Sequence, residues 1–172
     1  MDQRTSIDGY TVAYEGEDLY FPVFIVLAVG AGLLAYAFAK GNAFLLGPGA
    51  AALGFAYYNV PLLETGRPRL GAGQYGLFVE GLGVIAWRAV STMDLIAVSS
   101  RGTVEQELCV TLGKPLDAAL IADWRRRPAH RLLMRLPWTM RGNEIRIPLE
   151  IFDRPPREIH YNMTRLWRYF RA

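Results

Sequence analysis

Three glycines, Gly71, Gly73 and Gly76, have the spacing G-x-G-x-x-G. In dinucleotide-binding proteins this spacing lets a backbone turn approach a pyrophosphate, and it requires a strand before the glycines and a helix after them. Here a polar, proline-containing stretch precedes the glycines and a strand-like stretch follows them. We therefore expect a flexible connection at this point and no nucleotide site.

The other residues with catalytic or metal-binding side chains are scattered along the chain. His130 and His160 are far apart in the sequence, whereas a zinc site needs several clustered ligands. Ser99, Ser100 and Thr103 lie in a turn-like stretch that lacks the G-x-S-x-G pattern of a nucleophile elbow. Five acidic residues also form no paired motif: Asp94, Glu105, Glu107, Asp117 and Asp123. We expect no catalytic residues, no metal and no cofactor.

One segment, DWRRRPAHRLLMRLPWTMR at 123–141, has a pattern with functional content. Arginines alternate with tryptophan, leucine and methionine, and such a segment can lie among lipid headgroups with its arginines toward anionic lipid. The alternative is a solvated face with a loop that caps the sheet. The candidate contact residues are Trp124, Arg125, Arg126, Arg127, Arg131, Arg135, Trp138 and Arg141. Nucleic acid is not an expected partner, because the chain also carries a predicted membrane anchor.

Charge is distributed unevenly over the 172 residues, which are 52% hydrophobic and 20% charged. Residues 1–19 carry one base and five acids, residues 20–63 carry only Lys40, and residues 64–172 carry 17 bases and 11 acids. A mean hydropathy of +0.13 therefore averages an acidic segment, an apolar block and a basic domain. The single cysteine, Cys109, excludes an intrachain disulfide and the disulfide-rich secreted class.

The apolar block predicts a transmembrane hairpin. Two uncharged runs, 20–39 and 41–63, are separated by Lys40 and a short flexible turn, and about 20 helical residues cross a bilayer. We expect spans at about 20–39 and 43–62. A buried soluble hairpin is disfavoured, because a chain of this size can hardly surround so many uncharged residues. A cleaved signal peptide is disfavoured by the acidic residues that precede the first run.

Aromatic and basic residues at the hairpin ends predict its orientation. Tyrosine and phenylalanine favour the membrane interface, and Lys and Arg favour the cytoplasmic side. The expected interface anchors are Tyr20, Phe21, Tyr57, Tyr58, Arg67 and Arg69. Both termini and the domain at 64–172 are then cytoplasmic, and only the turn at Lys40 lies outside.

The sequence of the domain at 64–172 predicts strands followed by a helix. Alternating or short apolar stretches between turn residues predict strands at 76–84, 84–90, 95–99, 104–112 and 143–152. Helical spacing predicts a short helix over 116–124 and an amphipathic helix over 155–170. The expected fold class is an α+β membrane protein. In it, a two-helix transmembrane hairpin precedes a small antiparallel sheet or barrel, which the C-terminal amphipathic helix closes.

The stretch GLFVEGLGVIAW, which ends at Trp87, resembles the core of bacterial pleckstrin-homology-like (bPH) domains. The PRL at 68–70 and the closing IRIPLEIF with its terminal helix fit the same pattern. The whole chain is similar to small bacterial inner-membrane proteins in which a two-helix hairpin precedes such a domain. The resemblance implies that the hairpin is inserted near the domain's start, so that residues 10–14 can add a strand to the sheet. The strand count between 113 and 143 stays open.

These features together predict a non-enzymatic scaffold or accessory protein of the bacterial inner membrane. Its PH-like domain would mediate protein–protein contact at the cytoplasmic face, with a membrane protein or a second copy as partner. The alternative is a membrane-surface module that contacts anionic lipid through residues 125–141.

Overall fold

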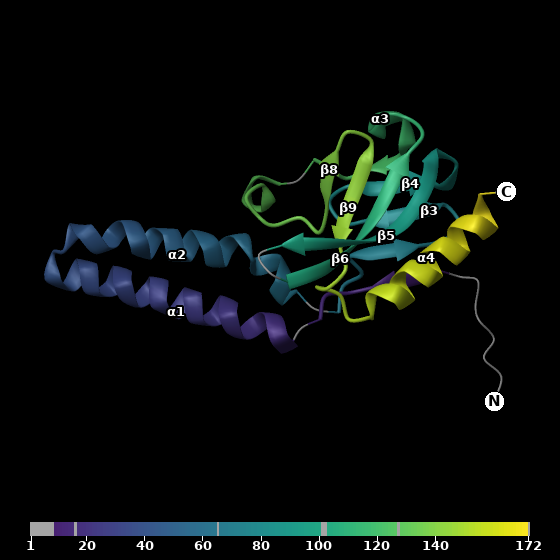
Figure 1. Ribbon diagram of the computed structural model, residues 1–172. Helices are drawn as coiled ribbons and strands as arrows, with labels where there is room; N and C mark the ends of the chain where they lie inside the picture. Colours follow the sequence, from purple (N-terminus) through teal and green to yellow (C-terminus); the bar gives the residue numbers. More distant parts are fainter. Residues whose placement is uncertain (1–8, 16, 65, 101–102, 127, 172) are drawn as a thin grey trace. The chain divides into compact units, whose positions relative to one another are not determined.

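The computed structural model describes residues 9–15, 17–64, 66–100, 103–126 and 128–171. Internal contacts divide these residues into two compact units (Figure 1). The folded unit contains residues 9–14, 66–126 and 136–171, and the hairpin unit contains residues 15–64 and 128–135. The sequence predicted a division into 1–19, 20–63 and 64–172, whereas the contacts group residues 9–14 with the folded unit and residues 128–135 with the hairpin.

The first sheet of the folded unit is antiparallel, in the order β1-β2-β3-β4-β7. Its strands are β1 (Tyr10–Val12), β2 (Leu70–Ala72), β3 (Gly76–Val79), β4 (Gly83–Ala86) and β7 (Leu120–Asp123). Strand β1 precedes the hairpin in the chain and β2 follows it, so the hairpin is an insertion between two paired strands. The segment 10–14, for which we expected a strand, supplies β1 and a further bridge from Tyr14 to Phe152.

The second sheet is also antiparallel, in the order β5-β6-β9-β8. Its strands are β5 (Val90–Ser100), β6 (Thr103–Leu112), β8 (Thr139–Arg141) and β9 (Glu144–Pro148). Period-two alternation places Leu108 opposite Ile147 and Val110 opposite Ile145, and all four side chains are buried. Val104, near the start of β6, is exposed.

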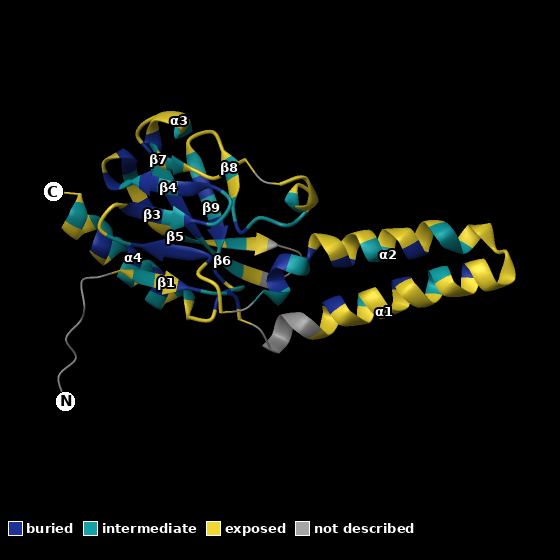
Figure 2. Ribbon diagram, turned by 180° about the vertical axis from the view of Figure 1, so that it is seen from behind, coloured by how far each residue is buried: buried dark blue, intermediate teal, exposed yellow. Residues whose placement is uncertain are grey.

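Helix α4 (Pro156–Phe170) contacts strands of both sheets. Its buried stripe is Ile159, Met163 and Leu166, which helical spacing brings to one face (Figure 2). Pro156 occupies the first turn, where its missing N–H costs little. The predicted amphipathic C-terminal helix therefore covers the apolar side of the strands.

The expected α+β class with antiparallel strands is confirmed, and of the two alternatives, sheet or barrel, the described residues form open sheets, since β1 and β7 end the first sheet and β5 and β8 end the second. One expectation about the folded unit was wrong. The helix expected over 116–124 stops after one turn, α3 (Leu116–Ala119), and the chain continues as β7. Pairing of β7 with β4 outweighs the helical spacing of a short apolar run.

The hairpin unit contains α1 (Glu17–Lys40) and a shorter return limb. That limb is a 3-10 helix η1 (Ala43–Leu45), the 13-residue helix α2 (Leu46–Tyr58) and a 3-10 helix η2 (Val60–Leu63). The single second span expected at 43–62 is thus divided into three pieces. The two α-helices approach closely where Gly30 lies against Ala52 and Leu53, and Gly49 lies against Leu34.

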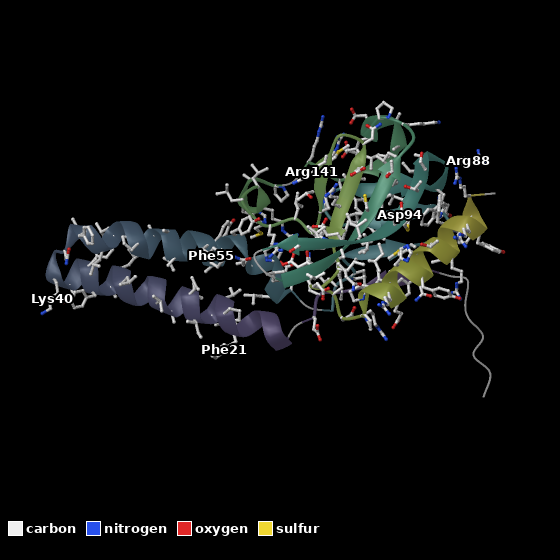
Figure 3. The ribbon with its side chains drawn as sticks, viewed as in Figure 1. Phe21, Lys40, Phe55, Arg88, Asp94 and Arg141 are labelled. Atoms are coloured by element: carbon white, nitrogen blue, oxygen red, sulfur yellow. The ribbon has the colours of Figure 1, made fainter. Side chains whose placement is uncertain are left out.

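Among the described residues, one helix is long and apolar enough to cross a membrane by length and composition. It is Phe21–Lys40 within α1, with a mean hydropathy of 2.2. Only 17% of this stretch is buried. Figure 3 shows Phe21 on α1 and Phe55 on α2 pointing away from the helix axes, with Lys40 at the turn between the helices.

Candidate functional site

The predicted contact segment at 123–141 does not form one surface, because its residues belong to both units. Trp124, Arg125, Trp138 and Arg141 lie in the folded unit, whereas residues 128–135 lie in the hairpin unit. Arg126 is exposed at the end of the first part, and Arg127 lies outside the described residues. The two parts are therefore considered separately.

Arg125 is held by two carboxylates of its own unit. Its guanidinium donates to Asp117 at 2.6 Å and to Asp123 at 2.7 Å and 2.9 Å. These hydrogen bonds lower the pKa of Asp123 to about 2, so this carboxylate is charged at neutral pH. The charge of Arg125 is locally balanced, which makes this residue a weak candidate for attracting anionic lipid.

Both tryptophans of the segment contact the folded unit. The Trp124 ring meets Phe78 edge-on, with 5.4 Å between the ring centroids. Trp138 Nε1 donates to the carbonyl oxygen of Glu80 at 3.1 Å. Arg141 ends β8 and is exposed. The tryptophans thus attach the two ends of the segment to the folded unit. Arg141 is an exposed charge on the same unit.

The middle of the segment, residues 128–135, is here called the foot segment. The Tyr57 hydroxyl donates to the carbonyl oxygen of His130, and the N–H of Arg135 donates to the carbonyl oxygen of Tyr58 at 2.9 Å. Arg131 approaches Glu64 at 3.6 Å. The foot segment, which includes the 3-10 helix η4 (Ala129–Arg131), is therefore tied to the end of α2 and the residues after it.

The expected interface anchors have different environments. Phe21, Tyr57 and Tyr58 are exposed on the hairpin, and Arg67 is exposed in the folded unit. Tyr20 lies in α1, and its side chain is outside the described set. Arg69 is the exception, and its assignment as an anchor was wrong.

Arg69 is only 2% exposed, inside the folded unit. Its guanidinium forms an ion pair with Glu80 and lies 5.1 Å from the centroid of the Tyr14 ring. A backbone hydrogen bond also links the two partners of the ion pair, since Glu80 N–H donates to the Arg69 carbonyl oxygen at 2.8 Å. A buried arginine is stable only when it is paired in this way. The sequence pattern of a basic residue after a span could not distinguish this environment from the membrane interface.

The outer face of α4 is a further candidate surface that sequence reasoning missed. Its exposed residues follow one another at helical spacing: Arg157, Tyr161, Arg165, Arg168 and Tyr169. A hollow of about 380 Å³ on this helix is lined by His160, Tyr161, Thr164, Arg165 and Arg168. This face carries three guanidinium groups and two tyrosine rings. The repeat of Arg and Tyr every three to four residues was the available signal.

In the part of the chain that the structure describes, the residues considered for catalysis or ligand binding have structural roles or lack the neighbouring groups that such chemistry needs. Gly71 lies in β2, and Gly73 and Gly76 enclose a turn that leads into β3, so no helix follows the glycine motif. His160 contacts the carbonyl oxygen of Met93 at 3.2 Å. Burial raises the pKa of the Cys109 thiol. Among the described residues, no group of three or more histidine, cysteine or acidic side chains could hold a metal ion.

Comparisons with protein families, curated proteins and solved structures gave no match to this chain. The surfaces described above are therefore interpreted from their own chemistry.

Proposed function

We propose that this protein is a non-enzymatic, membrane-anchored adaptor of the bacterial inner membrane. The hairpin unit would anchor it, and the folded unit, taken as PH-like from its sequence pattern, would bind a protein partner at the cytoplasmic face. The observation that carries the proposal is the exposed, apolar length of α1, with a mean hydropathy of 2.2 and 17% burial. In water, such a surface would be unfavourable by roughly 25 cal/mol for each Å² of apolar area.

A two-span arrangement is part of this proposal. The 20 residues of Phe21–Lys40 rise about 30 Å as a helix, which matches the hydrocarbon thickness. The 13 residues of α2 rise about 20 Å, and the 3-10 helices at its two ends lengthen the return limb by about 2 Å per residue. Both limbs would then cross, with both termini in the cytoplasm.

Accessibility labelling tests this topology. We expect a cysteine placed at Lys40, with Cys109 replaced by serine, to react with a membrane-impermeant maleimide in intact cells. A cysteine at Val104, which is exposed in the folded unit, should react only after the membrane is permeabilised. External labelling at position 104 without labelling at position 40 would reverse the orientation, and external labelling at both positions would contradict the anchored arrangement.

For the partner-binding surface, the outer face of α4 is the best supported candidate. Arginine and tyrosine are the residue types that dominate protein–protein interfaces, and three arginines on one face complement a negatively charged segment. Helix α4 also contacts strands of both sheets through its buried side, so its outer face rests on a rigid support. The proposed partner is a protein with a carboxylate-rich segment.

Charge reversal on α4 tests this binding. We expect Arg165→Glu/Arg168→Glu to weaken binding of a fluorescein-labelled, glutamate-rich peptide to the full chain in detergent by about tenfold or more, because repulsion replaces attraction. Fluorescence anisotropy measures the affinity. Lys114→Glu/Arg141→Glu is the matched control, since both residues are exposed, Figure 3 shows Arg141 away from α4, and the change in net charge is the same. Equal loss in both variants would show a non-specific charge effect and would contradict the α4 site.

The second candidate function is contact with anionic lipid through residues 125–141. Fewer arginines support this function than the sequence pattern indicated, because Arg125 forms ion pairs with Asp117 and Asp123. The specific observation in its favour is that His130, Arg131 and Arg135 lie at the α2 end of the hairpin unit, beside Tyr57 and Tyr58.

A further inference from the structure

Two neighbouring leucines of the foot segment are turned outward. Leu132 is 58% exposed and Leu133 is 74% exposed, although both follow directly after the 3-10 helix η4. Scattered exposed leucines are ordinary on protein surfaces. Two adjacent exposed leucines are informative here because of where the foot segment is attached to the hairpin.

That place is the end of the second hairpin helix. The segment is held on both sides of the leucines, at His130 by the Tyr57 hydroxyl and at Arg135 by the carbonyl oxygen of Tyr58. Arg131 also forms an ion pair with Glu64, the residue that follows the 3-10 helix η2. The leucines are thus presented by a short loop whose two ends are attached to the same tyrosine pair.

Tyr57 and Tyr58 have the residue type and position of interface anchors. Tyrosine prefers the boundary between headgroups and acyl chains, because its ring is apolar and its hydroxyl is polar. A loop tied to these two tyrosines lies at the same depth as they do. Leucine side chains at that depth enter the acyl boundary, while the flanking basic residues His130, Arg131 and Arg135 match the headgroup layer.

We propose that Leu132 and Leu133 form a wedge that inserts into the cytoplasmic leaflet beside the hairpin. This inference rests on the membrane anchoring proposed above and adds a third attachment point to it. The occupant is the lipid bilayer, because the wedge is continuous with hairpin surface that is itself apolar and exposed, such as Phe55 one turn before Tyr58. Its binding is apolar, so it does not depend on anionic lipid.

The depth of a label at position 133 tests the wedge. The full chain, with Cys109→Ser and Leu133→Cys, is labelled with bimane and reconstituted in phosphatidylcholine vesicles whose acyl chains are brominated near the headgroup. Bimane at Phe24→Cys, in the predicted span, is the positive reference. Bimane at Val104→Cys is the matched control, because Val104 is an exposed apolar residue of the folded unit.

We expect brominated lipid to quench the label at position 133 at least threefold more strongly than the label at position 104. Quenching should be equal in neutral vesicles and in vesicles containing phosphatidylglycerol, and it should persist in high salt.

Quenching at 133 no greater than at 104, with strong quenching at 24, would overturn the wedge and leave the anchor intact. Quenching that needs phosphatidylglycerol and disappears in salt would also overturn it, in favour of arginine contact at the surface. A blue-shifted label at 133 that lipid does not quench would indicate a covering protein and overturn it as well. Absence of quenching at 24 would overturn the anchor itself.

Discussion

Glu80→Ala is expected to lower the free energy of unfolding of the folded unit by about 3 kcal/mol, because it removes the carboxylate paired with a buried guanidinium. The Arg69 side chain is 2% exposed, whereas the Glu80 side chain is 28% exposed. The partial exposure of Glu80 places the effect at the lower end of the range for broken buried ion pairs.

Urea denaturation of the full chain in detergent, followed by tryptophan fluorescence, measures this effect. Asp94→Ala is the control, because Asp94 is an exposed acid on β5, and we expect a change within about 0.5 kcal/mol. The double variant Arg69→Met/Glu80→Ala should recover part of the loss, since an apolar side chain replaces a buried guanidinium that has lost its Glu80 carboxylate. A Glu80→Ala protein as stable as Asp94→Ala would show that the ion pair contributes nothing to folding.

Gly83→Ala is expected to cost more than 3 kcal/mol and to break the pairing of β4 with β7. Gly83 has φ +128°, a conformation that L side chains rarely adopt. In addition, an added Cβ would lie 1.8 Å from the carbonyl oxygen of Ala122, a backbone atom of the paired strand that cannot move alone. Conformational strain and a backbone clash therefore act together at this position.

Gly142→Ala separates the two causes. Gly142 also has a positive φ, +59°, but an added Cβ there meets nothing within 4 Å. We expect Gly142→Ala to cost about 1 kcal/mol, from conformational strain alone. The same urea denaturation compares the two variants. If Gly83→Ala lowered the free energy of unfolding no more than Gly142→Ala does, the close approach of β4 and β7 would not contribute to the loss of stability at Gly83.

The strands and the last helix were predictable because their patterns are long and regular. Alternation over β6 and β9 brings Leu108, Val110, Ile145 and Ile147 to one buried face, and α4 buries the stripe that begins at Ile159. The run at 116–124 was too short to distinguish a helix from a strand by spacing. Its residues 120–123 became β7 because the edge of β4 was available for pairing.

The candidate surfaces were only partly predictable. The sequence singled out residues 123–141, but it could not indicate that Arg125 is engaged by Asp117 and Asp123 while Arg135 is hydrogen-bonded to Tyr58. Tyr58 lies far from Arg135 in the chain. Asp117 and Asp123 reach Arg125 through the local turn of the backbone, which no periodicity of residue types encodes. The α4 face was missed although the repeat of arginine and tyrosine along this helix was a local signal that could have been used.

The sequence by itself determined where apolar and charged residues concentrate. It therefore set the hairpin at 20–63, whose single charge is Lys40, the alternating strands and the amphipathic helix, since these depend on local composition and period. Only the tertiary structure decided that Arg69 is buried against Glu80, that two open sheets form instead of a barrel, and that residues 128–135 join the hairpin. These outcomes depend on which distant groups pair with one another. Burial and pairing are properties of the whole fold, and a residue's type and local spacing do not fix them.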